Sequence, residues 1–105
     1  MARAYQLIED PGHWTNGVMA RSKDSASCSP FSEKAVRFCA LGALRRAAYD
    51  LTGNETTALR LTTMATRALL GGGLQLFAIN KLVYMNDARG HEAVLALFDK
   101  ALEAP

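Results

Sequence analysis

Residues 32–51 read SEKAVRFCALGALRRAAYDL, and this stretch decides which fold the chain can adopt. Small side chains recur every four positions, at Ala35, Cys39, Ala43 and Ala47, so that they form one row along a helix. A row of small side chains allows a second helix to approach closely. We therefore predict that the whole stretch forms the central helix of a small helical domain.

The flanks of this stretch support that prediction. Ser32 is a suitable N-cap, and Glu33 places a negative charge at the positive end of the helix. Gly53 and Asn54 follow the last apolar residue, and such residues commonly end a helix. The predicted helix therefore has a start signal and a stop signal.

The part of the chain before the central helix is expected to be mostly irregular. A short first helix is predicted over Ala2–Asp10, because Pro11-Gly12 follows it. Trp14, Val18 and Ala20 alternate with polar residues and favour a short strand.

This short strand is predicted to pair within a hairpin. A second extended piece near Ala26–Phe31 is the expected partner, and Lys23-Asp24-Ser25 is the expected turn.

Three more helices are expected after the central one. Apolar spacing predicts a helix over Glu55–Leu70, which the glycine triplet Gly71–Gly73 ends as a helix–helix connection. A short buried helix is predicted over Leu74–Tyr84, and a polar turn over Asn86–Gly90. The last segment, His91–Ala104, has an amphipathic helical pattern.

The predicted architecture is a mainly α, single-domain bundle of four to five helices, with a short extended or hairpin insertion after helix 1. Residues 1–105 are expected to form one helical domain, because 105 residues suit a single core. Half of the residues are apolar (50%) and 21% are charged, which is an ordinary globular composition.

Charge and hydropathy restrict the expected partners and location. The net charge of +2 is too small to indicate a nucleic-acid partner, and Arg37, Arg45 and Arg46 are interpreted as a solvated helix face. No apolar run is long enough for a membrane span. The N-terminus lacks the apolar core of a secretory signal. We therefore expect a cytoplasmic protein with Cys28 and Cys39 as reduced thiols.

Three short motifs resemble a family of small uncharacterised proteins of bacteria and their phages. The motifs are Trp14-Thr15-Asn16-Gly17, the Phe38-Cys39-x-x-Gly42-Ala43 run, and Asn86-Asp87 before the last helix. The sequence departs from the family pattern at Met85, where an aromatic residue is usual, and at Gly90, where Ser or Thr is usual. The resemblance implies a fold and a set of key positions, and it implies no reaction.

A cysteine hydrolase or transferase is the sharpest catalytic hypothesis for these residues. Cys39 would be the nucleophile, His91 or His13 the base, and Asp87 or Asn86 the residue that orients the base. An activated thiolate usually lies at a helix N-terminus, whereas the predicted helix places Cys39 about two turns inside. We therefore interpret Cys39 as a small buried core residue.

We predict no metal site and no cofactor. Cys28, Cys39, His13 and His91 have the composition of a structural zinc site, but they do not occur in the close pairs that such sites use. The glycine triplet lacks the Lys and Ser or Thr that follow a phosphate-binding loop.

The binding-site candidates are Trp14, Asn86 and Asp87. Structural roles explain them as well, since an indole closes one end of a small core and Asn or Asp side chains satisfy backbone N–H groups in turns. If the two segments meet in space, they form a polar pocket beside an aromatic wall.

The function predicted from the sequence is a non-enzymatic interaction or regulatory protein, associated with phages, that acts through a protein partner or as a homodimer. The alternative is a small cysteine-dependent enzyme or a ligand-binding protein. Its pocket would lie near Cys39, His91, Asp87 and Trp14.

Overall fold

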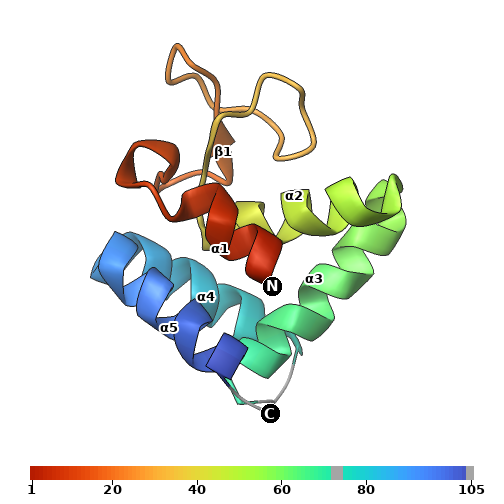
Figure 1. Cartoon of the computed structure of the whole chain (residues 1–105), viewed down its shortest axis with the longest axis vertical. Helices are drawn as coiled ribbons and strands as arrows, with labels where there is room; N and C mark the ends of the chain where they lie inside the picture. Colours follow the sequence, from red (N-terminus) through yellow and green to blue (C-terminus); the bar gives the residue numbers. More distant parts are fainter. Residues whose placement is uncertain (72–74, 104–105) are drawn as a thin grey trace.

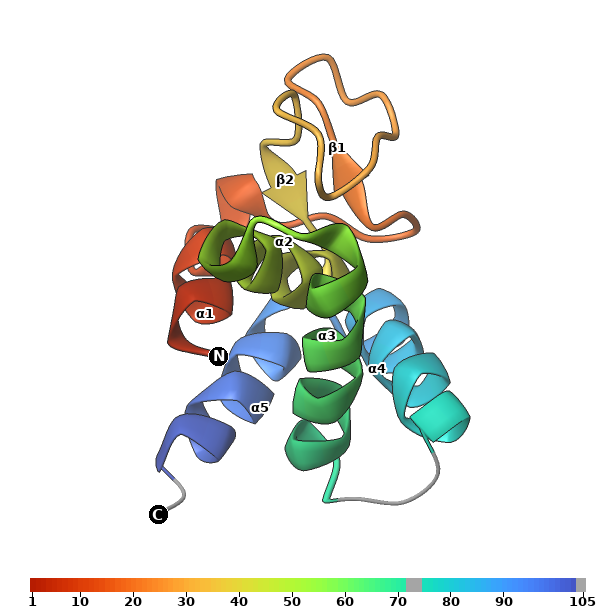
Figure 2. The same ribbon diagram turned by 90° about the vertical axis from the view of Figure 1, so that its right-hand side faces the viewer.

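The computed structural model describes residues 1–71 and 75–103, and within these it has five α-helices. The segment 9–39 between the first two helices is mostly irregular and lies at one end of the molecule (Figures 1 and 2); we call it the insertion. The elements, in chain order, are α1 (Ala2–Ile8), the 3-10 helix η1 (Pro11–His13), β1 (Ala20–Arg21), β2 (Arg37–Phe38), α2 (Ala40–Thr52), α3 (Glu55–Leu69), α4 (Gln75–Arg89) and α5 (His91–Glu103). The prediction of a mainly α domain with a short extended insertion after the first helix is confirmed.

The hydrophobic core lies among the five helices, with Leu69 as the contribution of α3. Its largest fully buried apolar side chains are Ile8 of α1, Leu82 of α4, and Val94 and Phe98 of α5. Helix α4 runs toward the insertion, and α5 runs back from it (Figures 1 and 2). The two helices meet at Gly90, whose φ of 89° lies in the left-handed region that glycine adopts without strain.

The bounds of α3 agree with the predicted helix to within one residue. Asn54 caps the helix by accepting a hydrogen bond from the N–H of Thr57 at 2.9 Å. The buried hydroxyls of Thr62 and Thr66 donate to the carbonyl oxygens of Ala58 and Thr62, both at 2.7 Å. These bonds satisfy the buried hydroxyl groups within the helix itself.

The central helix begins at Ala40 and not at Ser32, so this prediction was wrong by two turns. The preceding residues, Arg37–Phe38, pair antiparallel with Ala20–Arg21. The backbone N–H of Val36 also donates to the carbonyl of Arg21 at 2.9 Å. Because the strand pairing satisfies this backbone, the helix can start only after it.

The predicted hairpin is correct in its turn and correct in part in its strand partner. The N–H of Ser25 donates to the carbonyl of Ser22 at 2.9 Å, and Ser25 has a φ of 66°. The predicted partner segment pairs through a bridge between Arg21 and Ser27, and the N–H of Cys28 donates to the carbonyl of Ala20 at 3.0 Å. The second strand of the sheet is Arg37–Phe38, which the sequence pattern had placed in the helix.

Helix α4 is longer and more exposed than predicted. It continues through Asn86 and Asp87, where a polar turn was expected, and ends at Arg89. Phe77 and Tyr84, seven residues apart on one face, are 65% and 62% exposed, so only the face that carries Leu82 and Asn86 is buried. The parts of the predictions that fall on residues 72–74 and on Ala104 lie outside the described residues.

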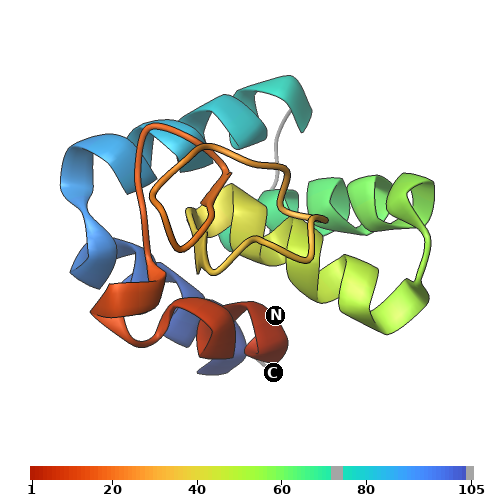
Figure 3. The ribbon, with the colours of Figure 1, turned by 90° about the horizontal axis from the view of Figure 1, so that it is seen from above.

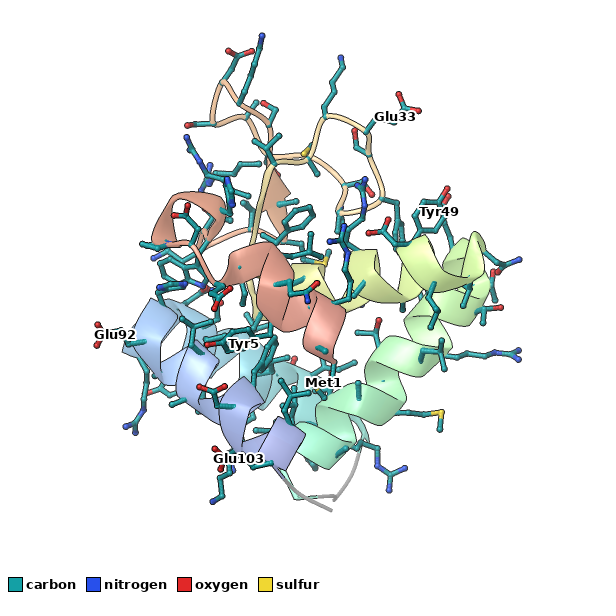
Figure 4. The ribbon with its side chains drawn as sticks, in the orientation of Figure 1. Met1, Tyr5, Glu33, Tyr49, Glu92 and Glu103 are labelled. Atoms are coloured by element: carbon teal, nitrogen blue, oxygen red, sulfur yellow. The ribbon has the colours of Figure 1, made fainter. Side chains whose placement is uncertain are left out.

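The insertion lies over the start of α2, as the view from above shows (Figure 3). Gly42 makes this contact possible, because a Cβ at this position would overlap the carbonyl oxygen of Met19. At the other end of α2, Tyr49 projects toward the insertion (Figure 4), and its ring centroid lies 5.1 Å from that of Phe31. The insertion therefore contacts α2 through its backbone at Gly42 and through a side chain at Tyr49.

We expect Gly42→Ala to destabilise the protein by about 3 kcal/mol, because the added methyl group overlaps a backbone carbonyl that cannot rotate away. Gly53→Ala is the matched control. Gly53 also prefers glycine, with a φ of 67°, but a Cβ there meets open space, so the expected cost is about 1 kcal/mol. Urea unfolding measures both, and equal losses of stability would contradict the close-approach interpretation.

Candidate functional site

The side-chain amide of Asn86 is the centre of the site. Asn86 is fully buried on α4. Its Oδ1 accepts a hydrogen bond from the indole Nε1–H of Trp14 at 2.8 Å and one from the backbone N–H of Ala40 at 2.9 Å. One side-chain oxygen therefore joins the insertion, the first turn of α2 and α4.

The nitrogen of the same amide is also fully used. Asn86 Nδ2 donates to the backbone carbonyl of Thr15 at 3.1 Å and to Asp87 Oδ1 at 3.1 Å. Asp87 Oδ1 accepts a further bond from the N–H of Gly17 at 3.0 Å. We call this set, Trp14, Thr15, Gly17, Asn86 and Asp87, the Asn86 node.

Local backbone structure places the insertion residues of the Asn86 node. The N–H of Thr15 donates to the carbonyl of Phe38 at 3.0 Å, and the Thr15 hydroxyl accepts from Arg21 Nε at 2.9 Å. Gly17 has a φ of 79°, a conformation that turns its N–H toward Asp87 at little cost for glycine. The Trp14 segment and the Asn86-Asp87 pair therefore touch.

Cys39 lies at the N-cap of α2, and the expectation that it lies two turns inside a helix was wrong. Its Sγ accepts a hydrogen bond from the N–H of Gly42 at 3.3 Å. Burial raises the pKa of the Cys39 thiol, and this effect outweighs the lowering by the backbone N–H groups of Gly42 and Leu41. The smaller effects of Asp87, which raises the pKa, and of Arg45, which lowers it, oppose each other. Although it lies at a helix N-terminus, Cys39 is therefore not an activated thiolate.

His91 lies away from the thiol, at the start of α5. Its Nε2 contacts the backbone carbonyl of Ile8, which requires that this nitrogen carry the proton. Its ring centroid lies 5.6 Å from that of Trp14. Among the predicted catalytic residues, the structure brings Cys39 and Asp87 to one pocket and places His91 against α1 and the indole.

A pocket of about 630 Å³ lies between the insertion and α2, α3 and α4. We call it the insertion pocket. Its lining includes Val18, Phe31, Cys39, Arg45, Leu59, Val83 and Asp87. Its volume is typical of pockets that hold small molecules.

The sequence interpretation missed Arg45 as a site residue. It assigned Arg45 and Arg46 to a solvated face, but Arg45 is half-buried and lines the insertion pocket. Arg46 donates to the carbonyls of Pro30 and Ser32 at 3.1 and 2.7 Å, so it binds the insertion. No local sequence pattern predicts these positions, because the insertion that contacts Arg46 and lines the pocket of Arg45 becomes their neighbour only in the folded chain.

No group of three or more His, Cys, Asp or Glu side chains suited to a metal ion occurs within residues 1–71 and 75–103. Of the four residues that share the composition of a zinc site, Cys28 and Cys39 are free thiols, and His91 contacts a backbone carbonyl. Among the described helices, none has the length and apolar character needed to cross a membrane.

The fold and the Asn86 node define a small, mainly α domain that is held together by a buried polar cluster. The chain belongs to a family of unknown function, DUF6197, whose model matches residues 1–104. The resemblance to a family of uncharacterised proteins is thereby confirmed. Comparisons with curated proteins and with solved structures found no match.

We expect Asn86→Ala to cost about 3 kcal/mol of stability, because it leaves two buried donors without their acceptor and a buried carbonyl without its donor. Trp14 is the only tryptophan, so its fluorescence should report loosening of the insertion in the same experiment. Asn80→Ala, at an exposed position of α4, is the control and should change stability by less than about 0.5 kcal/mol. Equal effects of the two substitutions would contradict the assigned role of Asn86.

Native-state labelling with a small thiol reagent should modify Cys28 before Cys39, because Cys28 is partly exposed and Cys39 is 4% exposed.

The raised pKa of Cys39 also has a consequence for the pH dependence of stability. As pH rises above the ordinary range of a thiol, the unfolded chain loses this proton first, so stability should fall. Intact mass and urea unfolding measure the two effects. Rapid labelling of Cys39 in the folded Cys28→Ser variant at neutral pH would contradict this account.

Proposed function

We propose that this protein is a non-enzymatic interaction domain that binds an acidic amphipathic segment of a partner protein. The surface that supports this proposal lies where the end of α3 faces α4 and α5, and we call it the basic groove. Apolar residues from all three helices line it: Leu69, Leu70, Met85, Leu97 and Ala101. Its volume is about 680 Å³.

The charge of the basic groove is the observation that carries the proposal. Lys81, Arg89 and Lys100 line it, and no acidic residue does so in the described part of the chain. Within residues 1–71 and 75–103, none of the three cations has a carboxylate oxygen within 4.0 Å. An apolar groove bordered by such cations is complementary to a helix with an apolar face and acidic flanks.

An exposed aromatic side chain gives the groove a suitable anchor. Tyr84 lines the groove and is 62% exposed, although it is large and mostly apolar. Tyrosine is enriched among the residues that dominate binding energy, because it buries a large area with few rotatable bonds. Phe77 lies two helical turns away on the same face of α4 and extends the apolar surface.

The charge pattern favours a different protein over a second copy of the chain. In a two-fold symmetric dimer through this groove, the same cations of both copies would face each other. Such like-charge contacts oppose association. A nucleic acid is a poorer fit as well, since the cations surround an apolar floor and the net charge of the chain is only +2.

The alternative, a cysteine-dependent enzyme, has less support from the geometry. A nucleophilic thiol needs a lowered pKa and an adjacent base. Burial raises the pKa of Cys39, and the protonated Nε2 of His91 contacts the carbonyl of Ile8. A phage association rests on the resemblance of three short motifs and stays a prediction.

Two synthetic helical peptides with the same leucine-rich face test the proposal, one flanked by glutamates and one by lysines. We expect the acidic peptide to bind, and the double reversal Lys81→Glu and Lys100→Glu to weaken its binding at least about tenfold. The control reverses two exposed lysines of the insertion, Lys23→Glu and Lys34→Glu, and should leave the affinity unchanged. Fluorescence polarisation at two salt concentrations measures both.

Three outcomes would overturn the proposal. The first is that the two peptides bind equally or not at all. The second is that both double variants weaken binding equally. The third is that a single-stranded oligonucleotide binds better than the acidic peptide.

A further inference from the structure

The insertion pocket contains a cation, Arg45, that forms no ion pair within the described part of the chain. Arg45 is half-buried, and burial lowers the pKa of its guanidinium group. Its Nη1 lies 3.0 Å from the sulfur of Met19, which is a weak acceptor, and its Nε is buried without a hydrogen-bond partner. Among residues 1–71 and 75–103, no carboxylate oxygen lies within 4.0 Å of Arg45. A partly buried guanidinium group whose Nε has no hydrogen-bond partner is unfavourable, and an incoming anion would offset that cost.

The same pocket has a negative pole formed by Asp87. Its Oδ1 accepts both hydrogen bonds from the Asn86 node, whereas its Oδ2 accepts none among the described residues. Asp87 raises the pKa of the buried Cys39 thiol and Arg45 lowers it, because both charged groups lie near this thiol. Asp87 is therefore held in place by one oxygen and has a second oxygen free for a cationic donor.

Apolar side chains form the walls between and around these two charges. Val18 and Phe31 come from the insertion, Leu59 from α3 and Val83 from α4. Glu55 adds a second carboxylate at the start of α3. With two carboxylates and one guanidinium, the pocket disfavours a plain anion, and it favours a molecule that carries charges of both signs.

We propose that the insertion pocket binds a small zwitterionic ligand with an apolar side chain, of the class of the apolar α-amino acids. The ligand carboxylate would lie at the guanidinium of Arg45, and its ammonium group at Asp87 Oδ2. The apolar side chain would contact the wall formed by Val18, Leu59 and Val83. This site is separate from the basic groove, so it does not depend on the proposed protein partner.

Ligand chemistry provides the primary test, with the unmodified protein. L-leucine, L-methionine and L-phenylalanine serve as probes, and leucinamide and N-acetyl-L-leucine each remove one of the two charges. We expect leucine to shift the amide resonances of Gly17 and Cys39, which line the pocket. Leucinamide and N-acetyl-leucine should bind at least about tenfold more weakly than leucine, because each leaves one pole of the pocket unpaired.

Two variants should each abolish one of the two preferences for leucine. Arg45→Met keeps the apolar stem and removes the charge, so it should bind leucine no better than leucinamide. Asp87→Asn keeps an acceptor for the N–H of Gly17 and removes the charge, so it should bind leucine no better than N-acetyl-leucine. Arg60→Met and Asp99→Asn change exposed residues outside the pocket and should keep the wild-type order.

The proposal would be overturned if none of the three amino acids binds the unmodified protein, or if leucine, leucinamide and N-acetyl-leucine bind equally. It would also be overturned if Arg45→Met and Arg60→Met show the same ligand preference. Because an uncharged methionine side chain needs no counter-ion, Arg45→Met should unfold at a temperature no lower than the wild type. A lower unfolding temperature in the absence of ligand would assign Arg45 a structural role instead.

Discussion

The buried amide of Asn86 is the interaction on which the rest of this structure depends. An amide in a core must place its donors and its acceptor on partners, or the cost of burying it is not recovered. Here the partners are the Trp14 indole, the backbone of Thr15 and the first N–H of α2. Since these groups come from the insertion and from α2, and Asn86 itself from α4, satisfying one side chain fixes the three parts relative to one another.

This constraint explains how a segment with only two-residue strands can be ordered. The backbone of the insertion bonds to itself between Arg21 and Arg37. Thr15 and Gly17 bond to Asn86 and Asp87 of α4, and Pro30 bonds to Arg46 of α2. Gly42 then lets the insertion approach α2 to backbone contact. The insertion pocket is a consequence, because the insertion contacts α2 at its start and near Tyr49 and leaves space between the two contacts.

The residues that the sequence singled out as binding candidates thus have a shared structural role. Trp14 and Asn86 bond to each other, and Asp87 holds Gly17 with one oxygen. The groups left for a ligand are Arg45 and the second oxygen of Asp87, beside apolar walls. The basic groove is a different kind of surface, in which cations surround an apolar floor. The two regions suit different partners because one contains charges of both signs and the other contains cations alone.

The sequence by itself determined the helical character of the chain. Asn54 and Gly53 mark the boundary between α2 and α3, and apolar spacing locates α3 and α5 within a residue or two. These signals are local, since caps and amphipathic faces depend on residues within a few positions.

Only the tertiary structure decided where α2 begins, how far α4 continues and which residues form the site. Arg37–Phe38 leave the helix because they pair with Ala20–Arg21. Asn86 stays helical because its amide bonds to groups 46 and 72 positions away, at Ala40 and Trp14, and not to a turn of its own. A local pattern cannot contain such partners, because they become neighbours only when the chain has folded.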